Sequence, residues 1–137
     1  MLDTNILVSA LISRDGAPGR VLASIKRAGL TLVTSEAQLD ELRSVVRRDR
    51  LRSCFRPEEA EDLISNLEAV GEVTRNLPDL NAAPDPDDNP ILATAIAGRA
   101  DLIVSGDKKH MLALGDIDGI PIVTAAVAAG RLRRQQH

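Results

Sequence analysis

The alternation of short apolar runs with segments of helical periodicity constrains the fold of this chain more than any other feature. The apolar runs lie at residues 1–7, 30–34, 72–75, 102–104 and 120–123. Between and after them, apolar residues recur at helical spacing in segments 18–28, 36–49, 57–71, 91–97 and from 124 onward. Ser35 is expected to cap the second of these helices, with Gln38 completing a capping box. The small residues of the segment 91–97 are expected to allow close packing on the sheet. Strands that alternate with helices are typical of a parallel sheet that helices cover on both faces. We therefore expect an α/β fold with three layers, α/β/α.

Length and composition indicate one globular domain. The 137 residues suit a single domain, which we place at residues 1–130, followed by a basic C-terminal tail at 131–137. No apolar run approaches the roughly 18 residues of a membrane span, and no secretory signal is indicated, so we expect no membrane partner. The single Cys54 forms no internal disulfide, which favours the reducing cytoplasm.

Charge and aromatic content restrict how the chain could bind nucleic acid. The formal net charge is -3, and Phe55 is the only aromatic residue. A passive binder with a basic field and stacking platforms is therefore excluded, and a nucleic-acid role must rest on local patches or metal ions. The densest basic run could contact phosphates, although a solvated helix end explains it equally well: Arg47, Arg48, Arg50 and Arg52.

Acidic residues follow several of the apolar runs, at the edge where parallel α/β folds bind ligands. Asp3 lies in or at the end of the first strand, and Asp107 directly follows the run at 102–104. Glu41 sits on the helix after the second strand, at the edge of its buried stripe, and a surface ion pair with Arg48 is the alternative interpretation for it. Three more acids precede the helix at 91–97, where Asn89 before Pro90 is the expected N-cap: Asp85, Asp87 and Asp88.

Acids gathered at one sheet edge predict a metal centre. Carboxylates this close would repel each other and raise each other's pKa unless divalent cations lay among them. Oxygen ligands without His or Cys clusters favour Mg²⁺ or Mn²⁺ over zinc. Such ions stabilise the attacking and leaving oxygens of phosphodiester hydrolysis. The residues themselves thus suggest metal-assisted cleavage of a nucleic acid.

Three motifs resemble those of a PIN domain, in order and spacing: LDTNILVSALI, SEAQLDELRSVV and DPDDNPILATAIAGRADLIVSGDKKHML. The resemblance spans Met1 to about Val123 and is strongest to the VapC-like ribonuclease toxins of bacterial toxin–antitoxin pairs. It implies a central parallel sheet of order 3-2-1-4-5, Mg²⁺ or Mn²⁺ as cofactor, and hydrolysis of single-stranded RNA. It departs from the family in one respect, because only Met1 and Leu2 precede the first acid.

The resemblance also implies the site residues. The catalytic and metal-binding acids are expected to be Asp3, Glu41, Asp88 and Asp107, with Asn5 and Ser105 as the residues that orient the first and last acids. Among the three loop acids we choose Asp88, since Pro90 fixes the helix start beside it. Asp85 and Asp87 are interpreted as solvated loop acids. The two histidines, His110 and His137, have no partners at ligand spacing, and we expect no role for either.

The resemblance also implies partners, and two alternative functions are considered beside it. The expected partners are an RNA substrate and a cognate antitoxin protein, with a homodimer left open. A receiver-like signalling domain controlled by phosphorylation also uses acids at strand ends. It would need a phosphoacceptor Asp at the end of a middle strand, and the LTLVTS stretch has none. A catalytically silent PIN-like scaffold that binds a protein is the third alternative, and the intact set of acids argues against it.

Overall fold

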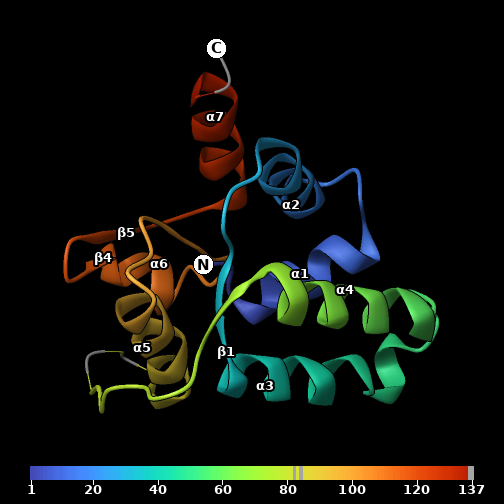
Figure 1. Ribbon diagram of the computed structural model, residues 1–137, viewed down its shortest axis with the longest axis horizontal. Coiled ribbons are helices and arrows are strands. Elements are labelled where there is room, and N and C mark those ends of the chain that lie inside the picture. Colours follow the sequence, from blue (N-terminus) through green and yellow to red (C-terminus); the bar gives the residue numbers. More distant parts are fainter. Residues whose placement is uncertain (82, 84, 136–137) are drawn as a thin grey trace.

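The computed structural model describes residues 1–81, 83 and 85–135, so that His137 and the end of the expected basic tail lie outside the described residues. Its helices are α1 (Thr4–Ile12), α2 (Ala17–Ala28), α3 (Glu36–Val46), α4 (Pro57–Val70), α5 (Asn89–Ala97), α6 (Met111–Leu114) and α7 (Ala125–Gln135), with short 3₁₀ turns η1 (Asp49–Leu51) and η2 (Pro86–Asp88). The strands are β1 (Val33–Ser35), β2 (Glu72–Thr74), β3 (Ile103–Val104), β4 (Asp116–Ile117) and β5 (Ile120–Val123). Helices α3 and α4 pack together, and α2 lies beside α7 (Figure 1).

The strands form two small sheets. Strands β1 and β2 pair in parallel, and β3 pairs in parallel with β5. Leu2 forms a parallel bridge with Val104, so the start of the chain lies alongside β3. Each of these pairs matches a neighbouring pair in the expected order 3-2-1-4-5. The complete order and a single central sheet are not shown, because no strand pairing joins β1 to the chain start within the described residues.

One pairing was not expected from the sequence. Strand β4 runs antiparallel to β5, with Ile117 opposite Ile120. The turn between them holds Asp118 and Gly119 at positive φ, the conformation that a two-residue hairpin loop requires. The sheet containing β3 is therefore mixed rather than purely parallel.

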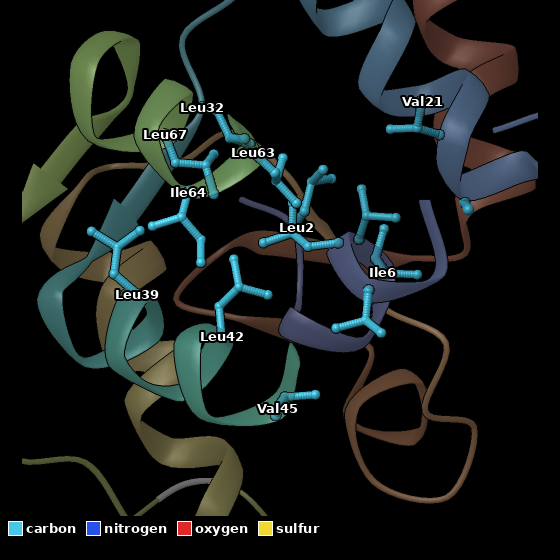
Figure 2. Close-up of a cluster of buried hydrophobic side chains, with 14 of the residues drawn as sticks. Leu2, Ile6, Val21, Leu32, Leu39, Leu42, Val45, Leu63, Ile64 and Leu67 are labelled. Carbon is cyan, nitrogen blue, oxygen red and sulfur yellow. The ribbon is translucent and has the colours of Figure 1, made fainter. Parts of the chain in front are cut away.

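Helices cover both faces of the strands. Neighbouring residues alternate between the two faces of a strand, and three such pairs divide between two separate hydrophobic cores: Met1 and Leu2, Leu32 and Val33, Ile103 and Val104. Leu2 packs among side chains of α3 and α4 (Figure 2). The opposite core contains residues of α5 and α6. This alternation supports the expected α/β/α layering.

The first expected strand, residues 1–7, is wrong beyond Asp3. Helix α1 begins at Thr4, and the carbonyl of Asp3 accepts from the amide of Ile6 at 2.9 Å. Between Thr4 and Ala10 only Asn5 and Ser9 are exposed. So short and mostly apolar a run fits a buried helix as well as a buried strand, and its periodicity cannot distinguish them. The consequence is that Asp3 lies between a strand bridge and a helix start.

The small residues of α5 permit close packing, as the sequence indicated. A Cβ atom added at Gly98 would overlap the Val33 side chain of β1. The absence of a side chain there lets the end of α5 approach the sheet. None of the helices in the described part of the chain combines the length and apolar character needed to cross a lipid bilayer.

Candidate metal centre

Ser105 connects the first and last of the expected acids. Its buried hydroxyl donates to Oδ2 of Asp3 at 2.9 Å and accepts from the backbone N–H of Asp107 at 3.1 Å. Asp3 is buried at the start of α1, while Ser105 directly follows β3. One side chain therefore sets the positions of two acids that are distant in the sequence.

The environment of Asp3 makes its ionised form more costly than in water. Burial raises the pKa of its carboxyl, and the negative charge of Asp107 raises it further. The Ser105 hydroxyl and the backbone amides at the start of α1 lower the pKa, but burial is the largest effect. A cation at this carboxylate would relieve the cost of burying its charge.

Asp107 shapes the turn that precedes α6. Its Oδ1 accepts from the backbone N–H groups of Lys109 and His110, at 3.1 and 3.2 Å. Its Oδ2 lies 3.3 Å from Nδ1 of His110. The turn thus holds the imidazole ring against the carboxylate, an arrangement that the sequence reasoning missed. The available signal was the three-residue spacing of Asp107 and His110, which brings the two together when the segment turns.

Asp88 carries the most perturbed carboxyl of the site. It stands at the N-cap position of α5, and its buried Oδ2 accepts no hydrogen bond from the described residues. Burial raises the pKa of Asp88 to about 6, with smaller contributions from the negative charges of Asp3, Asp85 and Asp107. His110 lowers this pKa. A buried carboxylate oxygen without a donor is the kind of atom that a bound cation would satisfy.

The expected N-cap of α5 is wrong by one residue. Asn89 is the first residue of the helix rather than its cap, and its Oδ1 accepts from the backbone N–H of Ala83 at 2.9 Å. The 3₁₀ turn η2 directly precedes α5, so that Asp88 occupies the cap position. Asn89 instead ties the preceding loop to the helix start, close to the acid.

The other two loop acids differ from each other. Oδ1 of Asp85 accepts from the backbone N–H of Asp87 at 3.0 Å, and Asp87 itself is exposed. One possible ligand atom from each of Asp85, Asp88 and His110 lies within 4.8 Å of the other two. Asp85 is therefore placed closer to a site than the interpretation as a solvated loop acid suggested.

Glu41 is exposed on α3, yet its charge interacts with the other acids. Partial burial and then the charges of Asp3 and Asp87 raise its pKa, while the nearby Thr4 hydroxyl and the charge of Arg48 lower it. No ion pair between Glu41 and Arg48 occurs among the described residues, although the sequence left that alternative open. The charge of Asp3 therefore acts on the carboxyls of both Glu41 and Asp88.

A buried network positions α3 relative to Asp3. Ser35 caps the helix as expected, its Oγ accepting from the backbone N–H of Gln38 at 3.1 Å. The Gln38 amide, expected to complete a capping box, instead donates to the carbonyl of Leu2 at 2.6 Å and accepts from Thr34 at 2.7 Å. Leu2 directly precedes Asp3, and Gln38 precedes Glu41 by one helical turn. The bond from Gln38 to Leu2 therefore links the two segments that carry these acids.

The remaining expected residues lie at the surface. Asn5 is exposed, and only its backbone amide acts on the Asp3 carboxyl in the described structure. The basic run beyond α3 is exposed throughout, and Arg52 pairs with Asp49 at 3.2 Å. Arg47 and Arg52 border a hollow of about 850 Å³ whose lining includes Phe55.

Comparison with known proteins shows the family of this chain. The family model described as "PIN domain" matches residues 1–109, and the chain belongs to this family. PIN domains are generally metal-dependent nucleases. The chain is also similar to the uncharacterized protein MJ1680 of Methanocaldococcus jannaschii, with 28% identity over 109 residues that cover 79% of this chain and 70% of that protein. No solved structure gives a significant match.

Proposed function

We propose that this protein is a metal-dependent endoribonuclease that hydrolyses phosphodiester bonds of single-stranded RNA. The observation that carries the proposal is that the charges of Asp3 and Asp107 act on the carboxyls of the other acids. The charge of Asp3 raises the pKa of both Glu41 and Asp88, and the charge of Asp107 raises that of Asp3 and Asp88. Four acids from four separate segments therefore share one electrostatic environment.

The residues present fit a divalent cation. The proposed ligands are all carboxylates, namely Asp3, Glu41, Asp88 and Asp107, and such hard oxygen donors suit Mg²⁺ or Mn²⁺. The buried Oδ2 of Asp88, without a donor in the described residues, supports this fit. When bound, the cation supplies a Lewis acid for the phosphodiester and lowers the pKa of a water molecule.

The other residues hold the acids and the substrate in place. Ser105 keeps Asp3 and Asp107 in a fixed relation, and Gln38 does the same for the segments that carry Asp3 and Glu41. The exposed Arg47, Arg48 and Arg50 offer positive charge for phosphates of a single strand. Asn5 remains a proposed orienting residue through its position after Asp3.

We further propose that the nuclease is the toxin of a toxin–antitoxin pair acting in the cytoplasm, with an antitoxin protein as its partner. The support is the VapC-like order and spacing of the acidic motifs. The compact unit at 1–130 and the basic segment at 131–137 remain our proposed division of the chain. Helix α7 continues into that segment as far as Gln135.

The decisive experiment is a cleavage assay with and without metal. The purified protein is incubated with labelled single-stranded RNA, duplex RNA and single-stranded DNA, in Mg²⁺, in Mn²⁺ or in EDTA. We expect metal-dependent cleavage of single-stranded RNA, lost in Asp3→Asn and kept in Asp118→Asn. Asp118 is a matched control because it is an exposed acid at positive φ, which asparagine accepts readily.

The same assay separates the alternatives. Metal binding without cleavage of any substrate would favour the protein-binding scaffold. Phosphoryl transfer from a small phosphodonor to an aspartate would favour the receiver-like domain, to which the family match lends no support. For the toxin role, expression in bacteria should arrest growth with the wild-type chain and not with Asp3→Asn.

A further inference from the structure

His110 lies beside Asp88 at the candidate metal centre, although it is not one of the four proposed acidic ligands. Its ring is half-buried, and one of its nitrogens approaches ligand oxygens of Asp85 and Asp88 with every separation within 4.8 Å. Ligand atoms bound to one ion at bond lengths of roughly 2.0–2.2 Å stand about 3–4 Å apart. Small side-chain rotations would therefore bring these three atoms around a single cation.

Two further observations point to a ligand at this position. The buried Oδ2 of Asp88 accepts no hydrogen bond from the described residues, so the cluster contains an unsatisfied acceptor. In addition, Asp107 accepts from the His110 amide and contacts Nδ1 of the ring at 3.3 Å, which fixes the orientation of the imidazole. Carboxylates orient metal-bound histidines in this way in many proteins.

We propose that His110 donates a ring nitrogen to a divalent cation held together with Asp85 and Asp88, so that this centre is a mixed nitrogen and oxygen site selective for Mn²⁺ over Mg²⁺. The inference rests on the proposed function for the presence of a metal. It goes further by assigning two ligands, Asp85 and His110, outside the four acids. Imidazole suits first-row transition ions, whereas Mg²⁺ prefers oxygen ligands and keeps several waters.

The proposal is tested by spectroscopy of bound Mn²⁺ rather than by activity. Pulsed electron paramagnetic resonance of the Mn²⁺-loaded protein detects a directly coordinated ¹⁴N, and labelling histidine with ¹⁵N identifies its source. We expect a histidine ¹⁴N coupling in the wild-type protein. It should be absent from His110→Gln and retained in Lys109→Gln, the matched control at an exposed neighbouring side chain.

Binding titrations give a second measurement. We expect His110→Gln to weaken Mn²⁺ binding by about 10- to 100-fold and Mg²⁺ binding far less, and His110→Asp to shift the preference toward Mg²⁺. Asp85→Asn should weaken Mn²⁺ binding in parallel. Bound Mn²⁺ without histidine coupling in the wild-type protein would overturn this proposal and leave an oxygen-only nuclease site intact. Failure to bind Mn²⁺ or Mg²⁺ at all would overturn both this proposal and the proposed function.

Discussion

The hydroxyl of Ser105 donates to Oδ2 of Asp3 at 2.9 Å across 102 positions of sequence, and accepts from the amide of Asp107 at 3.1 Å. The bridge between Leu2 and Val104 places the two segments side by side just before these residues. The hydrogen bond is buried, so water cannot replace either partner without rearrangement. The geometry of the first acid thus depends on a residue outside the proposed set of four acidic ligands.

Replacing Ser105 by alanine should reduce both stability and metal binding. A buried hydrogen bond to a charged group contributes about 1.5–3 kcal/mol, and loss of a residue that orients a ligand weakens metal binding by about 10- to 100-fold. Denaturant unfolding and Mn²⁺ titration would measure the two effects. Ser44→Ala, at an exposed position of α3, is the control and should change neither. Unchanged metal affinity in Ser105→Ala would show that Asp3 is held by other contacts.

Replacing Asp3 by asparagine should abolish cleavage while preserving the fold. The amide retains the shape of the carboxyl group but loses the charge that attracts the cation. Because burial and the charge of Asp107 raise the pKa of Asp3, removing the charge relieves an unfavourable interaction. The metal-free variant should therefore melt at the same temperature as the wild-type protein or higher at neutral pH. Full cleavage activity in this variant would contradict the proposed mechanism.

The metal-free protein should also show a pH dependence that originates at Asp88. A carboxyl whose pKa rises on folding stabilises the folded state at low pH, and that contribution is lost as the pH rises through the folded value, here about 6. The melting temperature of Asp88→Asn relative to wild type should thus increase between pH 5 and 7.5 in EDTA. The effect is on the order of 1 kcal/mol because Asp88 is only partly buried.

Comparing Asp88→Asn with the wild-type protein removes an opposing effect of the Met1 amino group on stability. Burial lowers the pKa of the Met1 amino group to about 6, so its contribution to stability increases with pH over the same range. It is present equally in both proteins and cancels in the difference. Excess Mn²⁺ should stabilise the wild-type protein most at the higher pH, because its ligands must be deprotonated. A difference in melting temperature that does not vary with pH would contradict the assignment to Asp88.

The sequence predicted the helices most accurately where their periodicity is clear. Elements with clear periodicity and caps, such as α4 between Pro57 and Gly71, begin and end within a residue of the expected positions. The start of α1 was missed because Ser9 is the only polar residue between Ile6 and Ala10, which is too little to reveal a helical period. Ser35 was correctly predicted to cap α3. The hydrogen bond from the Gln38 side chain to the carbonyl of Leu2 was not predicted, because it depends on tertiary packing.

The acids illustrate the same limit. The order of the motifs indicates which segments carry acids, but it does not determine which of several neighbouring acids turns inward. Because the 3₁₀ turn η2 directly precedes α5, Asp88 and not the expected Asn89 occupies the cap position. The turn after β3 places His110 against Asp107. Both are local backbone arrangements that the spacing of residue types does not specify.

Comparing the three loop acids in one assay tests which of them serves the centre. Asp88 has a buried oxygen without a described donor and a pKa raised to about 6, Asp85 shares a cluster with it and with His110, and Asp87 is exposed. We expect Asp88→Asn to lose the most cleavage activity and Mn²⁺ affinity, by at least about 100-fold in rate. Asp85→Asn should lose less, and Asp87→Asn should remain within a fewfold of wild type. Because the three substitutions are identical and lie within four residues, differences in folding are small, and thermal melts would confirm this. A greater loss at Asp87 than at Asp88 would show that the chain presents a different carboxylate to the cation.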